Sequence, residues 1–262
     1  MTKRIYGWKH QKKDSRDYKF SNLRCLRALV ASLPSSMDLR QWDSPIEDQG
    51  ELGSCTANSL TGILQFNEVK YASSGSVYQN LSRLFIYYNE RALEGSVDQD
   101  SGAEIRDGIK TLATYGVCNE TVWPYNVDQF TIKPSAQCYT SALPDVIHSY
   151  YSLDAATPAQ TLINIKTAIA SGEPVSFGFD VYDSFESDTV AQTGIMSIPD
   201  TTTESIQGGH AVVFVGYDDA KQWFIVRNSW GTNWGDKGYF YMPYAVVLNG
   251  MASDFWVVIK EV

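Results

Sequence analysis

The hydrophobic pattern changes character midway along the chain. In residues 55–71 the apolar positions Leu60, Ile63, Leu64 and Val69 fall near helical spacing. The same spacing predicts three further helices, over residues 80–93, 103–115 and 159–170. Glycines at or just after the ends of these segments, such as Gly116, are typical stop signals for helices.

Beyond residue 175 the apolar runs become short and rich in β-branched and aromatic residues, which is typical of strands. They predict strands over residues 175–179, 210–217, 223–227, 239–242 and 255–259. Residues 118–144 are irregular and rich in turn residues. A helical first half and a sheet-rich second half indicate two lobes around a cleft, and therefore an α+β fold.

We expect three parts along the chain. Residues 1–33 form an N-terminal arm, and Pro34 breaks the chain just after it. Residues 34–144 form a mainly helical lobe, and residues 145–262 form a β-rich lobe.

Composition excludes several classes of protein. Of the 262 residues, 44% are hydrophobic, which is too many for a disordered chain. The longest uninterrupted apolar runs, such as Ala211–Val215, are far shorter than the roughly 20 residues of a membrane span. Residues 1–10 are charged and aromatic, so no signal peptide is visible. We expect a protein without membrane contact, either cytoplasmic or exported by another route.

The formal net charge of −9 averages two unlike parts. Residues 1–33 hold nine Lys or Arg and two Asp, a balance of +7, which leaves −16 on the rest. An acidic body argues against nucleic-acid binding. A basic, aromatic arm is compatible with a nucleic-acid contact, with a solvated tail, or with a segment lying across its own acidic body.

A predicted hairpin brings together two groups that can act in catalysis. Residues 218–221 read as a turn between two apolar runs, which places His210 opposite Ser229 and next to Asn228. An Asn carbonyl that accepts a hydrogen bond from one ring nitrogen fixes the tautomer of the histidine. The other ring nitrogen of His210 is then free to serve a thiol.

Cys55 is the candidate thiol. It stands at the start of the first predicted helix, directly after Gly53 and Ser54. The positive end of a helix dipole and a neighbouring imidazolium both stabilise a thiolate. The competing interpretation is that Cys55 is a small buried apolar residue and His210 a structural histidine.

Three segments resemble the papain/cathepsin cysteine proteases: Asp48–Cys55, Gly209–Val212 and Asn228–Tyr239. The third, with its Asn-Ser-Trp-Gly, Trp-Gly and Gly-Tyr pattern, is the most specific of them. The resemblance runs from about Leu33 to the C-terminus. It implies a papain-like two-lobe fold, with a helical left lobe, an antiparallel β-barrel-like right lobe and the active site in the cleft between them.

The same resemblance implies roles for individual residues. Cys55 is the expected nucleophile, His210 the general base and acid, and Asn228 the residue that orients the imidazole. Gln49, six positions before Cys55, is the expected side-chain donor of the oxyanion hole. Trp230 is expected to cover the hydrogen bond between His210 and Asn228.

Substrate-binding residues are assigned on weaker patterns. Ser101 and Gly102 resemble the family's Gly-rich segment, which pairs with an extended peptide; a surface turn is the alternative. We also place Gly209 and Trp230 among the residues that bind substrate. Ser253 is expected at the base of the main specificity pocket, with Asp254 close enough to favour basic side chains.

The sequence also departs from the family pattern. Leu52 and Thr56 stand where the family usually has a cysteine and an aromatic residue, which leaves the packing behind the nucleophile open. Besides Cys55 the chain has Cys25, Cys118 and Cys138. The last two form either a disulfide or two reduced buried thiols.

These observations together predict a cysteine endopeptidase that acts on polypeptides through a thiolate–imidazolium pair, as a monomer, with no metal and no cofactor. The alternatives are a papain-like transpeptidase or ligase, and a catalytically inactive papain fold that serves as a binding module. The arm resembles a short pro-segment. We expect it to lie partly over the cleft and slow substrate access, held by its positive charge against the acidic body.

Overall fold

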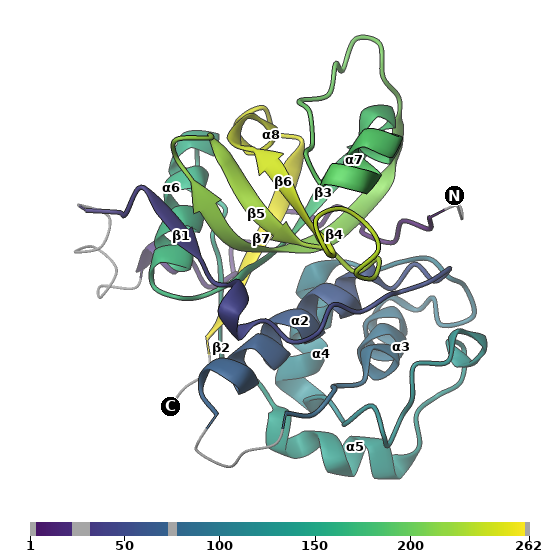
Figure 1. Ribbon diagram of the computed structural model, residues 1–262. Helices are drawn as coiled ribbons and strands as arrows, with labels where there is room; N and C mark the ends of the chain where they lie inside the picture. Colours follow the sequence, from purple (N-terminus) through teal and green to yellow (C-terminus); the bar gives the residue numbers. More distant parts are fainter. Residues whose placement is uncertain (1–3, 23–31, 73–77, 260–262) are drawn as a thin grey trace.

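A computed structural model describes residues 4–22, 32–72 and 78–259 (Figure 1). Its centre is a seven-stranded antiparallel sheet. The main path runs in the order β2 (Ser149–Ser152), β7 (Ala252–Ile259), β3 (Val175–Tyr182), β4 (Ile206–Asp218), β5 (Trp223–Arg227) and β6 (Tyr239–Pro243). A short strand β1 (Ser36–Asp38) pairs with β4.

The helices fall into two groups (Figure 1). One group lies below the sheet in this view and comprises α2 (Cys55–Lys70), α3 (Arg83–Glu94), α4 (Ile105–Tyr115) and α5 (Ala136–Ala142). The other lies with the sheet and comprises α6 (Pro158–Ala170), α7 (Asp188–Thr193) and α8 (Tyr244–Leu248). The predicted α+β fold with a helical and a β-rich part is confirmed. No helix of the described residues is long and apolar enough to cross a membrane.

Local signals set the helix ends. The Ser82 side chain accepts a hydrogen bond from the Phe85 backbone and caps α3, which ends at Gly95 with φ 72°. Helix α4 ends at Gly116, also at positive φ, where the sequence predicts a stop. Pro158 opens α6 after the capping residue Thr157.

The structure differs from the predictions in several places, and β2, α7 and α8 are among the elements that the sequence did not predict. The segment 118–144 contains α5, whose seven residues carry too little periodicity to be recognised. Strand β1 belongs to the sheet, although it precedes the helical part of the chain. In the β4–β5 hairpin, Val213 pairs with Arg227, one position away from the predicted register, and a bulge follows between Phe214 and Gly216.

Helix α2 lies against the sheet and is buried along most of its length. Many of its polar side chains are therefore satisfied by bonds to neighbouring segments. Ser59 Oγ donates to the carbonyl of Val212 on β4 at 3.1 Å, and Asn67 Nδ2 donates to the carbonyl of Val258 on β7 at 3.3 Å. These bonds fasten α2 to the sheet, since breaking either would leave a buried polar group without a partner.

Aromatic packing holds the strands together. Phe177 of β3 stacks on Phe214 of β4, with ring centroids 3.7 Å apart, and on Phe255 of β7 at 5.8 Å. Elsewhere in the protein, Cys118 and Cys138 are free, buried thiols. Cys25 lies outside the described residues.

Residues 4–22 of the arm pack against the body, so the alternative of a solvated tail does not hold for them. Trp8 and Phe20 are buried in the hydrophobic core. One ion pair has the expected arrangement, with the positive charge on the arm: the Arg4 guanidinium lies 3.3 Å from the Asp48 carboxylate of the body. Lys3, Arg24 and Arg27 lie outside the described residues.

In a more buried ion pair the arm supplies the negative charge and the body supplies the positive charge. Asp17 of the arm accepts two hydrogen bonds from Arg106 of α4, at 2.7 and 3.0 Å, and both side chains are nearly buried. The picture of a basic arm held on an acidic body is therefore incomplete. Apolar burial and a paired arm carboxylate also hold it in place.

We expect Phe20→Ala to lower the free energy of unfolding by about 3 kcal/mol, because it empties a closely packed core position. Phe20 is 2% exposed, whereas the neighbouring Tyr18 is 61% exposed. Tyr18→Ala serves as the matched control and should change stability by less than about 1 kcal/mol. Urea denaturation of the full chain measures both, and equal effects would show that the arm adds nothing specific to the core.

Candidate functional site

Cys55 is the first residue of α2, as predicted, and its side chain is fully buried. The preceding turn is held by Asp100, whose carboxylate accepts the Gly53 backbone N–H at 3.0 Å. Ser54 occupies the N-cap position, but its side chain makes no capping bond to the helix. The Ser54 side chain therefore caps none of the backbone N–H groups in the first turn of α2, where Cys55 lies.

His210 on β4 and Asn228 just after β5 are in contact, as the hairpin predicts. His210 Nε2 lies 2.8 Å from Asn228 Oδ1, so Nε2 carries the proton of this hydrogen bond. The other nitrogen, Nδ1, is buried without a hydrogen-bond partner. Trp230 stacks on the imidazole, with centroids 4.8 Å apart and planes 24° apart, in the covering position expected for it.

Burial shifts the pKa of both groups toward their neutral forms. It raises the pKa of the Cys55 thiol to about 12, against the opposing effect of hydrogen bonds from the backbone of Ala211, Gly7 and Thr56. Burial also lowers the pKa of His210 to about 4, although the bond to Asn228 acts the other way. The expected thiolate–imidazolium pair is therefore disfavoured in this conformation, since no water reaches either group.

Gln49 is fully buried, and its side chain is held at both ends. Its Oε1 accepts a hydrogen bond from Ser229 Oγ at 2.7 Å, which fixes the orientation of the amide. The Nε2 atom is thereby turned toward the carbonyl oxygens of Leu52, at 3.0 Å, and Ile5, at 3.3 Å. The second of these acceptors belongs to the N-terminal arm.

The arm contacts these residues directly. Gly7 lies so close to the turn before Cys55 that a Cβ on it would stand 1.8 Å from the carbonyl oxygen of Gly53. Tyr6 lies edge-on to the His210 ring, at 6.0 Å between centroids, and its hydroxyl donates to Glu186. The arm thus separates the Cys55 and His210 region from solvent.

The arm also pairs with the body as an added strand. Its Gly7 carbonyl accepts the Ala103 N–H at 2.8 Å, and its Lys9 N–H donates to the Ala103 carbonyl at 3.0 Å. These two bonds form a parallel bridge between Trp8 and Ala103. Gly102 lies beside the bridge, because a Cβ there would meet the Gly7 oxygen at 1.9 Å, and Ser101 Oγ accepts from Lys9 Nζ at 3.2 Å.

Trp8 fills a slot in the β-rich part. Two glycines form its wall: a Cβ on Gly178 would lie 1.9 Å from the indole, and one on Gly209 would lie 2.7 Å from it. At the end of the slot, Asp254 Oδ2 accepts the indole N–H at 3.1 Å. Ser253 lies nearer the surface, with its Oγ 3.4 Å from His10 Nδ1.

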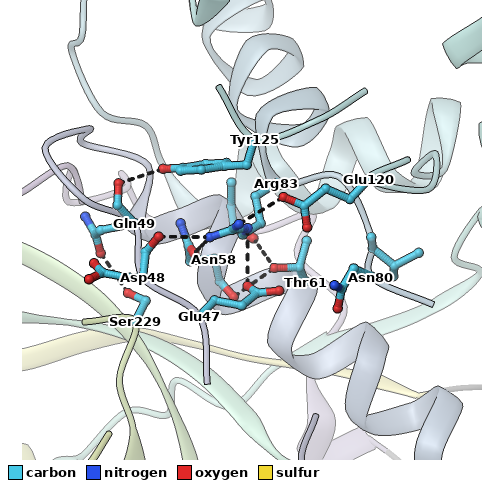
Figure 2. Close-up of polar contacts among 12 residues, drawn as sticks. Glu47, Asp48, Gln49, Asn58, Thr61, Asn80, Arg83, Glu120, Tyr125 and Ser229 are labelled. Atoms are coloured by element: carbon cyan, nitrogen blue, oxygen red, sulfur yellow. Dashed lines mark hydrogen bonds and ion pairs between the residues drawn. The ribbon is translucent and has the colours of Figure 1, made fainter. Parts of the chain in front are cut away.

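A buried polar network stands behind Gln49 (Figure 2). At its centre is Arg83 of α3, which donates to Glu120 at 2.9 Å and to the Asp48 carbonyl at 3.1 Å (Figure 2). The guanidinium lies over the ring of Tyr125, 3.8 Å from its centroid. The Tyr125 hydroxyl points at Gln49 and donates to its carbonyl at 2.8 Å (Figure 2).

All nine residues singled out from the sequence lie in or beside this region, and several contact residues, among them Ala103, Gly7, Gly178 and Tyr125, were not singled out. Ala103 makes the strand pairing expected of Ser101 and Gly102, and Gly7 belongs to the arm. Gly178 and Tyr125 stand alone in the sequence, so only their neighbours in space reveal them. Among the described residues, no group of three or more His, Cys, Asp or Glu is placed to hold a metal.

Comparison with known proteins agrees with these features. A family model described as papain family cysteine protease matches residues 33–258. An uncharacterised peptidase C1-like protein of Acanthamoeba polyphaga mimivirus is 46% identical over 215 residues, which cover 80% of this chain and 68% of that protein. Pro-cathepsin H of Mus musculus is 28% identical, and the matched region covers 84% of this chain and 63% of that protein.

Among solved structures, xylellain, a cysteine protease from Xylella fastidiosa, superimposes with a TM-score of 0.86 and 38% identity. The match covers 98% of this chain and 96% of xylellain. It therefore includes most of the N-terminal arm, which the family model leaves out.

We expect alkylation of Cys55 by iodoacetamide to be slow at pH 8 in the full chain. A thiol with a pKa of about 12 is ionised in only about one molecule in ten thousand at that pH, and the arm also blocks the reagent. Gly7→Ala, which prevents the arm from seating, should speed alkylation at least about tenfold. Mass spectrometry measures the rate, and the exposed arm residue Lys13 supplies the control Lys13→Ala. Equal rates in all three chains would contradict the role given to the arm.

Proposed function

Because the chain belongs to the papain family of cysteine proteases, we propose that it is an endopeptidase with Cys55 as its nucleophile and His210 as its general base and acid. One observation carries the proposal. His210 has one nitrogen fixed by Asn228 and the other buried without a partner, and the backbone of the next residue, Ala211, bonds to the Cys55 sulfur. A thiol and an imidazole in this relation are the minimum for nucleophilic acyl transfer.

The first half of the reaction forms a thioester. The Cys55 proton passes to His210, and the sulfur attacks the carbonyl carbon of the scissile peptide bond. The carbonyl oxygen then carries the negative charge, and we assign its two donors as the Cys55 backbone N–H and Gln49 Nε2. A side-chain donor of this kind lowers the barrier by about 3 kcal/mol. His210 returns its proton to the amine as the C–N bond breaks.

The second half releases the acid product. Water loses a proton to His210 and attacks the thioester carbonyl, and the same two donors hold the oxyanion. The C–S bond breaks, and the thiolate regains the pair with the imidazolium. Asn228 keeps the ring oriented throughout without ionising, and Trp230 keeps competing water from their hydrogen bond.

A substrate chain would bind where the arm now lies. The backbone of Ala103 and the Gly209 carbonyl offer hydrogen bonds to an extended peptide, as they do to the arm. Ser101 and Gly102 flank that strand position. We propose that the slot ending at Asp254 receives the main recognition side chain and favours one with an N–H or cationic end, with Ser253 at its outer edge.

The arm is proposed to inhibit the enzyme in the absence of a substrate. Its Ile5 carbonyl already accepts from Gln49 Nε2, the donor assigned to the oxyanion. At the sulfur, however, it presents the Gly7 N–H rather than a carbonyl carbon, so the arm occupies the site without being positioned for attack. Burial under the arm also keeps Cys55 and His210 neutral, which adds to the steric block.

An epoxysuccinyl probe for thiol proteases tests the proposed function. We expect weak labelling of the full chain, strong labelling of the Gly7→Ala chain, and none when Cys55→Ala is added. Cys118→Ala is the matched control, because Cys118 is another free and buried thiol, and it should leave labelling unchanged. Labelling at a residue other than Cys55, or none in the Gly7→Ala chain, would overturn the assignment.

Asp254 gives the proposed inhibition a pH dependence. Its carboxylate accepts from Trp8 and from the Gln11 backbone, and His10 and Asp154 are the charged groups that act on it. Burial raises the pKa of Asp254 to about 7 with the arm in place. Once the arm leaves, we expect that pKa to return toward about 4. At Asp254 the closed form therefore binds more protons between these values, so the contribution of Asp254 to closure weakens as pH rises toward 7. His210 contributes in the opposite direction, because its pKa is lowered while the arm buries it.

We compare the ratio of hydrolysis by the Gly7→Ala chain to that by the unaltered chain at pH 5 and at pH 8, with a substrate lacking basic residues. Asp254→Asn keeps an acceptor for Trp8 and removes the titrating group, so we expect the ratio at pH 5, relative to that at pH 8, to be larger with Asp254 than with Asp254→Asn. His210 titrates in both backgrounds, and its contribution cancels in the comparison. An unchanged pH dependence in Asp254→Asn would exclude Asp254 as the source.

A further inference from the structure

The hydroxyl of Tyr125 joins two segments that are separate around the active site. It donates to the Gln49 carbonyl at 2.8 Å and lies 2.6 Å from Ser54 Oγ. Gln49 carries one proposed donor of the oxyanion hole. Ser54 directly precedes Cys55, whose backbone N–H is the other proposed donor.

The direction of each hydrogen bond in this network can be assigned. Arg83 can only donate, so Asn58 Oδ1 accepts from it at 3.3 Å, and Asn58 Nδ2 then donates to Ser54 Oγ at 3.1 Å. Because the Tyr125 proton goes to the Gln49 carbonyl, the Ser54 hydroxyl must donate to the Tyr125 oxygen. The chain therefore runs in one direction from Arg83 to Gln49.

The other end of the same chain returns to the residue before Gln49. Arg83 also donates to the Asp48 carbonyl at 3.1 Å, so two consecutive carbonyls, those of Asp48 and Gln49, are held by the network. Burial raises the pKa of Tyr125 to about 12, which keeps its hydroxyl protonated and able to donate at neutral pH. The guanidinium over its ring further restricts the position of the phenol.

We propose that Tyr125 is a positioning residue for the oxyanion hole: by bridging Gln49 and Ser54 it sets the distance between the two donors. This inference rests on the proposed role of Gln49 in peptide hydrolysis. Ser229 fixes which way the Gln49 amide faces and also accepts the Gln49 backbone N–H at 2.9 Å, whereas Tyr125 ties the Gln49 carbonyl to the start of α2 through Ser54. Donors that must match a transition-state oxygen lose much of their effect when displaced by a fraction of an ångström.

A double-mutant cycle tests the proposal in the full chain with the arm opened by Gly7→Ala. We expect Tyr125→Phe to lower kcat about tenfold and to leave KM within about twofold, because the hole acts on the transition state. Gln49→Ala should lower kcat at least about a hundredfold. Adding Tyr125→Phe to Gln49→Ala should then cost less than about twofold, because the donor that Tyr125 positions is already gone.

A second readout separates positioning from general damage. Alkylation of Cys55 by iodoacetamide forms no oxyanion, so its rate should be the same with and without Tyr125→Phe. Tyr139→Phe is the matched control: Tyr139 is also partly buried and donates to an amide oxygen, that of Asn89, at 2.8 Å. It should leave kcat unchanged. Ser54→Ala, which removes the other half of the bridge, should lower kcat and couple to Gln49→Ala in the same way.

The outcomes distinguish the two levels of the argument. If Gln49→Ala leaves kcat intact, the proposed oxyanion hole is wrong and the positioning role falls with it. Two outcomes would overturn the positioning role alone. In the first, Gln49→Ala lowers kcat but Tyr125→Phe and Ser54→Ala do not. In the second, Tyr125→Phe and Ser54→Ala lower kcat by the same factor whether or not Gln49→Ala is present. If Tyr125→Phe lowers the alkylation rate of Cys55 together with kcat, the positioning role is also wrong, because the substitution then disturbs the site in general.

Discussion

The packing of α2 along the sheet is the constraint on which the rest of the structure depends. The helix begins at Cys55 and crosses beside β4 and β7, so its buried polar side chains bond to strand carbonyls such as that of Val212. This contact places the first residue of the helix beside Ala211, next to His210. A shift of α2 along the sheet would separate the thiol from the imidazole and break buried hydrogen bonds at the same time. Stability and the geometry of the site are thus secured by the same contacts.

The N-terminal arm completes the core and covers the site with one continuous segment. Phe20 and the pair of Asp17 with Arg106 anchor its later part, while Gly7 and Trp8 lie in the position proposed for substrate. These anchors are distinct from the contacts that hold the first part of the arm as an added strand beside Ala103. The arm also excludes water from Cys55 and His210, so the same contacts that block access favour the uncharged forms of both groups.

The polar groups around Gln49 show how the two halves of the protein share one site. Ser229, from the β-rich part, holds the side-chain amide, and Tyr125, from the helical part, holds the backbone carbonyl. Arg83 ties this arrangement to Asn58 within α2. The network is partly buried and its bonds are directional, so it resists small displacements that apolar packing would tolerate.

The sequence by itself determined what depends on local order. Periodicity and stop signals predicted α2, α3, α4, α6 and most strands. The predicted hairpin between β4 and β5 placed His210 at Asn228 despite a register error of one residue. The short helices α5, α7 and α8, of seven, six and five residues, were missed because so few residues carry little periodic signal. Only the tertiary structure decided the seat of the arm, the glycine-walled slot for Trp8 and the link from Tyr125 to Gln49. These contacts join residues far apart in the chain, and neither spacing nor composition encodes which distant backbone a single glycine or phenol will meet.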